Sequence, residues 1–161
     1  MVDAADVKSA GVIVEFGAGT GVFTEVIEQT RCDGSVFFAI EINPDLAAMA
    51  RRRCPTVRIY EDCVTNAAKY LEREGAKACD CIVSGLPWAA FDETLQDRIL
   101  DTTVDILESN GRFVTFSYIQ CRLLRRGRLF RSKLDGRFQQ VTKTRIVWRN
   151  FPPAFVYCAQ K

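Results

Sequence analysis

Short apolar runs alternate with helical patterns along the whole chain, and this alternation limits the fold more than any other feature. The apolar runs predict strands at residues 12–16, 35–40, 57–60, 79–84, 112–118, 137–148 and 154–159. Strands separated by helices favour a parallel sheet, and a turn at residues 150–153 makes one closing strand antiparallel. We therefore predict an α/β fold, a doubly wound seven-stranded mostly parallel sheet with helices on both faces and an antiparallel C-terminal strand, as one domain over residues 1–161.

The helical patterns carry their own start and stop signals. The predicted helices cover residues 22–29, 44–53, 64–74, the stretch that Asp92 caps and Asn110-Gly111 ends, and 119–134. We expect Val22 and Val26, with Phe23 and Ile27 as further candidates, to face inward from the first of these. In the last we expect Leu123 on the buried side, and Gly127 to weaken or divide the helix.

Histidine is absent and seven cysteines are scattered without a C-x-x-C pair. This composition excludes Ser-His-Asp and Cys-His catalysis and does not group ligands for a structural zinc ion, so we predict no metal. We expect reduced, mostly buried thiols and residence in the cytoplasm, since no apolar run is long enough to span a bilayer.

A glycine-rich turn, Glu15-Phe16-Gly17-Ala18-Gly19-Thr20-Gly21, joins the first strand to the first helix. Glycines allow the backbone to turn tightly and approach a ligand closely. The spacing lacks the third glycine of a dinucleotide fingerprint and the Gly-Lys-Ser/Thr ending of a P-loop. The carboxylate of Glu15 suits a cationic or amine-bearing ligand, such as the sulfonium and ammonium of S-adenosylmethionine.

Two further acids follow the next two strands. Glu41 lies where an acidic side chain accepts from a ribose diol, and Asp62 is placed to accept from an adenine amino group. Because the carboxyl ends of parallel strands meet at one edge of a sheet, we expect both acids to lie beside the glycine turn.

These residues resemble motifs I to III of class I (Rossmann-like) S-adenosylmethionine-dependent methyltransferases. The resemblance implies that the cofactor is S-adenosyl-L-methionine. It implies contacts to the methionine part, the ribose and the adenine from Glu15, Gly17, Ala18, Gly19, Thr20, Gly21, Glu41, Ile42, Asp62, Cys63 and Ser84.

The acceptor side of the site is expected at Ser84-Gly85-Leu86-Pro87-Trp88, after the fourth strand. Proline fixes this loop, unpaired carbonyls there can accept from a substrate amine, and Trp88 offers a flat face to a base or an ammonium. The alternative is a structural turn with a buried tryptophan. The catalytic candidates are Ser84, Leu86, Trp88 and Tyr118, and Tyr118 and Asp92 are candidate bases for which a packed tyrosine and a helix cap are equally good interpretations.

The Ser-Gly-Leu-Pro sequence and the ending from Val147 to Tyr157 resemble bacterial phospholipid N-methyltransferases. The same loop is similar to the Asn-Leu-Pro-Tyr of rRNA adenine dimethyltransferases. The first resemblance implies methyl transfer to the amine of phosphatidylethanolamine-type lipids. That family usually carries an amphipathic N-terminal segment, which we expect to be missing because the first strand begins near residue 12.

Charge is distributed unevenly along the chain. Residues 1–121 carry 11 basic and 19 acidic side chains, whereas residues 122–149 carry ten basic side chains and one acid. The basic and apolar stretch Arg122 to Lys133 suits an anionic membrane surface or phospholipid headgroup, on the inner face of the membrane. Two alternatives remain: RNA phosphates, or an ordinary helix with a solvated basic face. The function is accordingly a lipid N-methyltransferase, an adenine N6-methyltransferase, or a silent cofactor-binding module.

Overall fold

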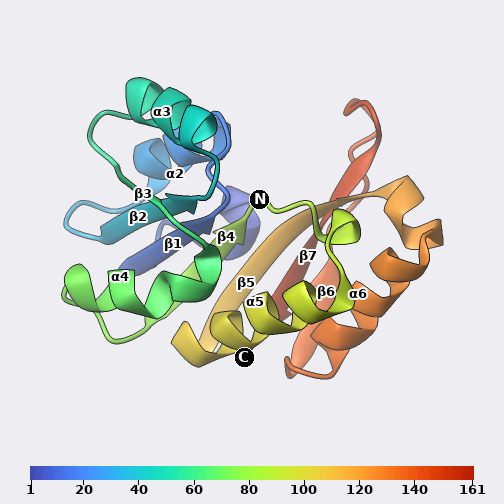
Figure 1. Cartoon of the computed structure of the whole chain (residues 1–161). Helices are drawn as coiled ribbons and strands as arrows, with labels where there is room; N and C mark the ends of the chain where they lie inside the picture. The colour runs from blue at the N-terminus through green and yellow to red at the C-terminus, as the bar shows by residue number, and fades with distance from the viewer.

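A computed structural model describes residues 1–161 and contains a seven-stranded sheet in the order β3-β2-β1-β4-β5-β7-β6 (Figure 1). β7 runs antiparallel to both neighbours, β5 and β6, and the other pairings are parallel. The predicted fold class is thus confirmed. The strands are β1 Val12–Phe16, β2 Val36–Glu41, β3 Arg58–Glu61, β4 Cys79–Ser84, β5 Leu107–Tyr118, β6 Gln140–Lys143 and β7 Ala154–Gln160.

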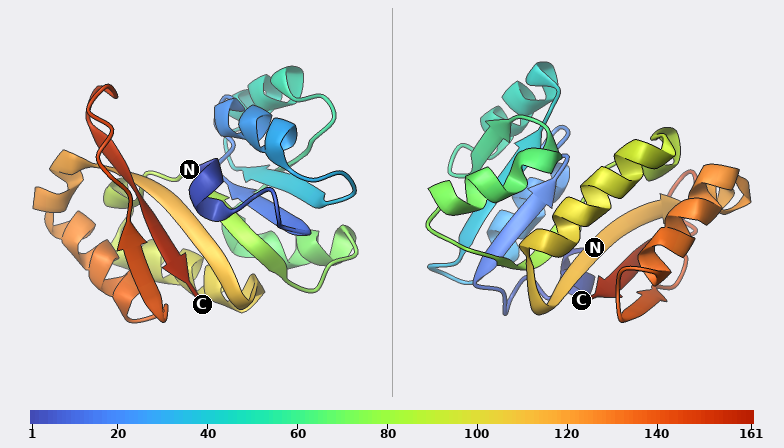
Figure 2. Two further views of the ribbon diagram at one scale, coloured as in Figure 1. Left: turned by 180° about the vertical axis from the view of Figure 1, so that it is seen from behind. Right: turned by 60° about the horizontal axis from the view of Figure 1, so that its bottom comes forward.

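Helices cover both faces of this sheet (Figure 2). One face carries α1 Val2–Ala5, α2 Val22–Thr30 and α3 Pro44–Arg53; the other carries α4 Ala67–Arg73, α5 Glu93–Ile106 and α6 Arg125–Asp135. Three 3-10 turns are η1 Val64–Asn66, η2 Trp88–Ala90 and η3 Ile119–Leu123. None of the helices has the length and apolarity needed to cross a bilayer.

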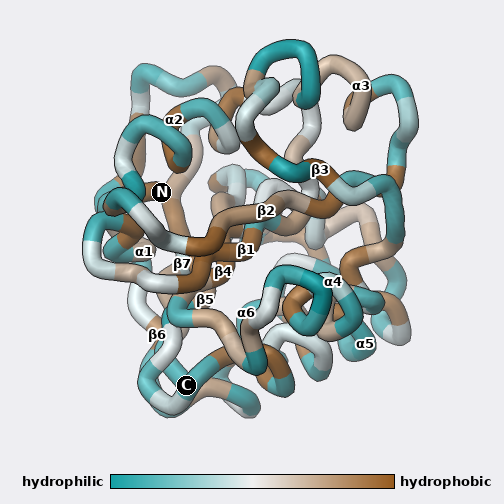
Figure 3. Tube along the Cα trace, turned by 90° about the vertical axis from the view of Figure 1, so that its left-hand side faces the viewer, coloured by the Kyte–Doolittle hydropathy of each residue, from teal (hydrophilic) through white to brown (hydrophobic).

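The sheet divides the core into two apolar layers. In β1, Val14 and Phe16 pack toward the face of α4, α5 and α6, whereas Ile13 packs toward α1, α2 and α3. Because both faces are covered, the central strands are mostly apolar on both sides instead of alternating with polar residues, and Glu15 of β1 and Asp80 of β4 are exceptions (Figure 3). This is why the strand positions were predictable from continuous apolar runs.

Two of the predicted helix caps are present. The Asn43 side chain accepts from the backbone amides of Asp45 and Leu46, and Pro44 occupies the first helical position of α3. The Asp92 carboxylate accepts from the Leu95 amide at 2.8 Å and starts α5. Asp92 is therefore a helix cap in this structure.

The inward face of α2 differs from the prediction at Val22 and Val26, and agrees with it at Ile27. Val22 and Val26 are 52% and 42% exposed, whereas Thr24 and Ile27 are fully buried. Both pairs fit a helical repeat, so the sequence pattern did not fix the rotation of the helix. The helix begins after its N-cap Gly21, whose backbone is left-handed (φ 83°).

Three other boundaries are corrected by the structure. α5 ends at Ile106 and passes directly into β5, so Asn110-Gly111 lies within the irregular start of that strand. The expected strand 137–148 shortens to β6, with an isolated bridge from Val147 to Ala154. The N-terminal helix α1 had no predicted counterpart.

Gly127 lies inside α6 and does not divide it; the break falls at Leu124, between η3 and α6. A β-carbon at Gly127 would stand 1.9 Å from the Cys121 carbonyl oxygen, so η3 packs onto α6 only because this residue is glycine. That same turn leaves Leu123 80% exposed, which contradicts its expected burial.

Candidate functional site

Two loops meet at the carboxyl edge of the sheet. The Gly17 amide donates to the Ile40 carbonyl at 2.8 Å, and the Gly85 amide donates to the Phe16 carbonyl at 2.8 Å. The loops after β1, β2 and β4 are thereby held side by side, and the predicted cofactor and acceptor motifs share one edge.

The glycine turn needs its glycines for different reasons. Gly17, Gly19 and Gly21 all have positive φ angles, of 77°, 55° and 83°. A β-carbon would stand 2.9 Å from Leu86 at Gly17 and 3.1 Å from the Ala50 α-carbon at Gly21. At Gly19 no protein atom lies within 4 Å of that position. Gly19 therefore presents bare backbone to open space, as a ligand-contacting turn requires.

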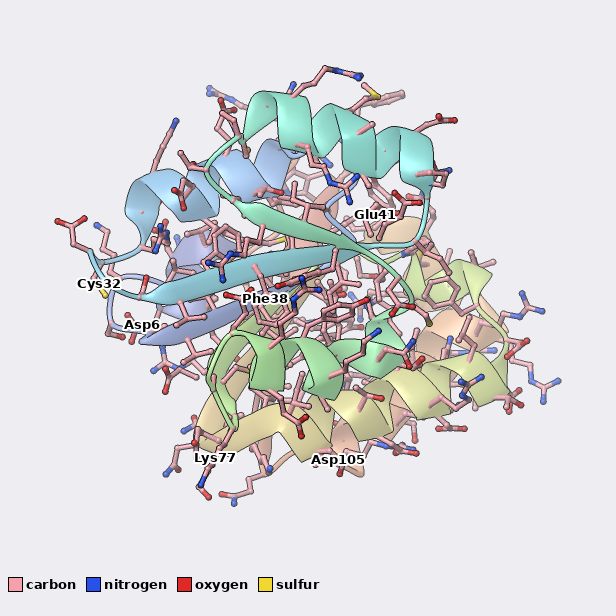
Figure 4. All side chains as sticks on the ribbon, turned by 60° about the vertical axis from the view of Figure 1, so that its left-hand side comes forward. Asp6, Cys32, Phe38, Glu41, Lys77 and Asp105 are labelled. Atoms are coloured by element: carbon pink, nitrogen blue, oxygen red, sulfur yellow. The ribbon has the colours of Figure 1, made fainter.

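Glu41 braces this turn from the end of β2, the end opposite to Cys32 (Figure 4). Its two carboxylate oxygens accept from the Gly19 and Asn43 amides, each at 2.9 Å. The side chain is buried, while that of Ile42 beside it is 69% exposed. Glu41 thus lies beside the glycine turn, as the strand order leads us to expect, whereas its contact with a ribose stays a prediction. The apolar surface of Ile42 is available to a ligand.

Glu15 is fully buried beneath the turn, between β1 and α2. Its Oε2 accepts from the Thr24 hydroxyl at 2.6 Å, and its Oε1 has no hydrogen-bond partner. Burial raises the pKa of Glu15 to about 8, an effect that the Thr24 hydrogen bond opposes and the nearby Glu41 charge increases. An unpartnered buried oxygen next to a cationic ligand site would regain a partner if that ligand carried an ammonium group.

This pKa predicts a pH dependence of stability. Because the folded pKa of Glu15 lies above 4.5, the folded state holds the proton more tightly than the unfolded state. The associated stability is complete below about pH 4.5 and is lost as the pH rises to about 8. We expect Glu15→Gln to remove this loss, so that its free energy of unfolding relative to wild type rises by a few kcal/mol across that window.

Urea denaturation of the ligand-free protein at several pH values measures this difference. The exposed Glu25→Gln on α2, the helix that carries Thr24, is the matched control and should show no such trend. A constant difference between Glu15→Gln and wild type from pH 5 to pH 8 would show that the buried carboxyl is already ionised at the lower pH.

Asp62 and Cys63 follow β3, at the third strand end of the predicted set. The Asp62 carboxylate accepts from Tyr70 (2.7 Å), Asn66 (2.9 Å) and the Cys63 amide (2.7 Å). These hydrogen bonds, that of Tyr70 foremost, lower the pKa of Asp62. Asp62 is thus a fixed, ionised acceptor whose Oδ2 has a single hydrogen-bonding partner, whereas its Oδ1 already accepts two bonds.

The acceptor loop contains Ser84, which is fully buried and accepts weakly from the Trp88 indole N–H at 3.3 Å. The indole N–H also donates to Thr115 at 3.0 Å, and Phe130 stacks on the ring with centroids 4.5 Å apart. Trp88 is 4% exposed. The sequence leads us to expect that the Trp88 ring offers an exposed face to the acceptor. The structure corrects this, because the ring packs into the core.

Two apolar cavities flank the end of β5. One, of about 220 Å³, is bounded by Leu86, Trp88 and Phe130; the other, of about 330 Å³, is bounded by Phe23 and residues of β7. Both are lined by Phe116 and Tyr118. Neither cavity is lined by a charged side chain, so this part of the edge suits an apolar group.

A backbone carbonyl beside these cavities is free to accept a hydrogen bond. Within residues 84–88, Gly85 is the one whose carbonyl accepts no hydrogen bond. The Tyr118 hydroxyl makes no hydrogen bond, and its ring packs edge-on against Phe116 with centroids 5.4 Å apart. Sequence reasoning missed Thr24 and Phe116 as site residues, since a hydroxyl at a helix position and a phenylalanine at a strand position carry no signal of their own.

The basic stretch Arg122 to Lys133 is partly neutralised. Lys133 pairs with Asp97 at 2.8 Å, Arg131 pairs with Asp135 at 2.8 Å, and Arg125 lies 3.6 Å from Glu93. Arg122 and Arg128 are exposed without an ion pair. No group of three or more residues is arranged to hold a metal ion.

No protein-family model matches the chain. An ornithine lipid N-methyltransferase from Singulisphaera acidiphila is 29% identical over 153 residues, which are 93% of this chain and 76% of that protein. The rRNA methylase from Streptococcus thermophilus has a similar structure, with a TM-score of 0.75, 14% identity, and coverage of 98% of this chain and 91% of that one.

Two further solved structures share the fold. The N-methyltransferase NodS from Bradyrhizobium japonicum has a TM-score of 0.72 at 15% identity, covering 99% of this chain and 91% of that one. The O-methyltransferase TomG from Streptomyces achromogenes, in complex with SAM, has a TM-score of 0.73 at 15% identity, covering 98% and 76%. With the bare turn at Gly19 and the braced Glu41, these likenesses support S-adenosyl-L-methionine as the ligand, and the chain has the Rossmann-like fold of methyltransferases.

Proposed function

We propose that this chain is an S-adenosyl-L-methionine-dependent N-methyltransferase that acts on the amine of a membrane lipid, phosphatidylethanolamine or another lipid with an amine headgroup. The observation that carries the acceptor class is the pair of uncharged apolar cavities at the end of β5, beside the acceptor loop. A lipid N-methyltransferase among the relatives supports the same class. An adenine would need a stacking surface, and the Trp88 ring is already stacked on Phe130.

On the cofactor side, each residue has a role that follows from its position. The glycine turn, Glu41 and Asp62 would hold the cofactor, and the unpartnered Glu15 oxygen would face its ammonium. When bound, the cofactor supplies an electrophilic methyl group: the amine lone pair forms the new N–C bond as the C–S bond breaks.

On the acceptor side, the free Gly85 carbonyl would accept a hydrogen bond from the amine. Burial in the apolar cavities lowers the pKa of an ammonium and favours the neutral amine that can attack. Its proton is lost to solvent, so no side-chain base is required.

A tritiated-methyl assay tests the proposal against mixed micelles of detergent with phosphatidylethanolamine, the same micelles with ornithine lipid, and total RNA. We expect label in at least one lipid amine and none in RNA. Label in RNA alone would replace the lipid acceptor with an adenine. Binding of the cofactor with no label in any arm would indicate a silent module.

Variants of Tyr118 test whether its side chain lines the acceptor cavities or acts as a base. We expect Tyr118→Phe to keep most of the rate on the labelled lipid, because the ring still lines both cavities. Tyr118→Asp should lower kcat/KM at least roughly tenfold, because it puts a charge against the alkyl part of the acceptor. A loss of similar size in Tyr118→Phe would instead assign a proton-transfer role to the hydroxyl.

A further inference from the structure

Large apolar side chains are exposed at one end of the molecule, on two neighbouring segments. Phe151 is 99% exposed, Leu123 80% and Trp148 71%, with Val147 and Leu124 also more than half exposed. We name these five residues the apolar tip. They come from η3 with its last turn, which follows the end of β5, and from the connection between β6 and β7, which extends beyond the sheet as a separate projection (Figures 1 and 2).

The two segments of the apolar tip are joined by hydrogen bonds. The Ile119 amide at the start of η3 donates to the Pro153 carbonyl at 3.0 Å. Within the connection, the Val147 amide donates to the Ala154 carbonyl at 2.8 Å, and the Asn150 side chain donates to the Pro152 carbonyl at 2.9 Å. The exposed side chains are therefore presented on an ordered turn.

Unpaired positive charge lies on the same stretches of chain as the apolar tip. Arg122, Arg128, Arg145 and Arg149 are exposed and form no ion pair, whereas Arg131, Lys133 and Arg137 pair with acids of α5 or with Asp135. Between residues 119 and 153 the chain has a single acid, Asp135. Arginine around exposed tryptophan and phenylalanine matches a surface that is anionic outside and apolar within.

The apolar tip also borders the acceptor cavities. Val147 and Asn150 line the larger cavity, Cys121 lines the smaller one, and Tyr118 lines both. A surface that contacts the tip would thus lie next to the openings through which an acceptor reaches the edge of the sheet.

We propose that the apolar tip docks this protein on an anionic lipid bilayer, with Trp148 and Phe151 entering the headgroup region and the four arginines contacting anionic lipids. A second copy of the chain is a poorer occupant, because a two-fold contact would bring the same unpaired arginines against each other. The inference rests on the proposed function only for the reason that docking is useful, namely access to a lipid acceptor.

The test uses the whole protein and vesicles of phosphatidylcholine and phosphatidylglycerol in equal parts, with acyl chains brominated for fluorescence quenching. The chain has two tryptophans, and Trp88 is buried while Trp148 is exposed. We expect quenching of Trp148 emission, absent in Trp148→Phe. Quenching should weaken at high salt and with phosphatidylcholine alone, because the arginine contacts are screened or removed.

The decisive variant is Trp148→Ser with Phe151→Ser, which should lower vesicle partitioning roughly tenfold or more. Met49→Ser, which removes a side chain 43% exposed on α3, is the matched control and should bind as wild type does. Unchanged partitioning of the double variant would overturn the proposal. The proposal would also be overturned if the wild type did not bind vesicles but did self-associate or bind RNA, and the double variant lost that association.

A micelle assay separates this inference from the proposed function. Methyl transfer to a lipid amine dispersed in detergent should be unaffected in the double variant, whereas transfer to the same amine in anionic vesicles should fall roughly tenfold. Vesicle quenching without transfer to any lipid would leave docking supported and reject the acceptor. Methyl transfer in micelles without vesicle quenching would support the lipid acceptor and reject docking.

Discussion

Gly19→Val is expected to lower affinity for S-adenosyl-L-methionine and its demethylated product by on the order of a hundredfold or more. No protein atom lies within 4 Å of the position that a β-carbon would take, so the added side chain would occupy space that the ligand needs. The backbone amide that donates to Glu41 remains in place. Isothermal titration calorimetry with the demethylated product measures the effect directly.

The control for Gly19→Val must share its backbone strain. Gly34 also has a positive φ, of 82°, with no atom within 4 Å of the added carbon, and it lies before β2, away from the candidate site. Both variants are expected to lose about 1–2 kcal/mol of stability. Gly34→Val should nevertheless bind the ligand as wild type does. Equal binding by both variants would remove the glycine turn from the cofactor site.

Trp88→Ala is expected to lower the free energy of unfolding by about 3–5 kcal/mol. The ring lies within the larger core layer, stacked on Phe130 and edge-on to Phe113, so its removal leaves a cavity. It also removes the donor to Thr115 and Ser84, both fully buried. Urea denaturation and a melting temperature lower by roughly 10 °C would register the loss.

Trp148→Ala is the matched control, since that ring is 71% exposed and its removal should change stability by less than about 0.5 kcal/mol. The free energy of unfolding of Trp88→Phe should lie between those of wild type and Trp88→Ala, because phenylalanine keeps aromatic packing and loses the indole N–H. If Trp88→Ala unfolds like wild type but loses turnover, the ring contacts the acceptor and is not a core residue.

Much of the fold followed from local chemistry that the sequence displays directly. Strands β1 and β4 match their predicted bounds because continuous apolar runs require a strand that is buried on both faces. The start of α3 follows from Asn43 and Pro44, which act within a few residues of themselves. The position of Glu41 beside the glycine turn follows similarly, since parallel strands bring their carboxyl ends to one edge.

What the sequence by itself determined, then, is the order of the elements, the class of the sheet and the acids at its carboxyl edge, because each depends on neighbours along the chain. Only the tertiary structure decided that Val22 turns outward, that Trp88 turns inward and that Leu123 is exposed. Rotation of a helix or a ring depends on which distant side chains fill the adjacent space. The carbonyl of Cys121 against Gly127, six residues away in sequence and 1.9 Å from where a β-carbon would be, is one such constraint.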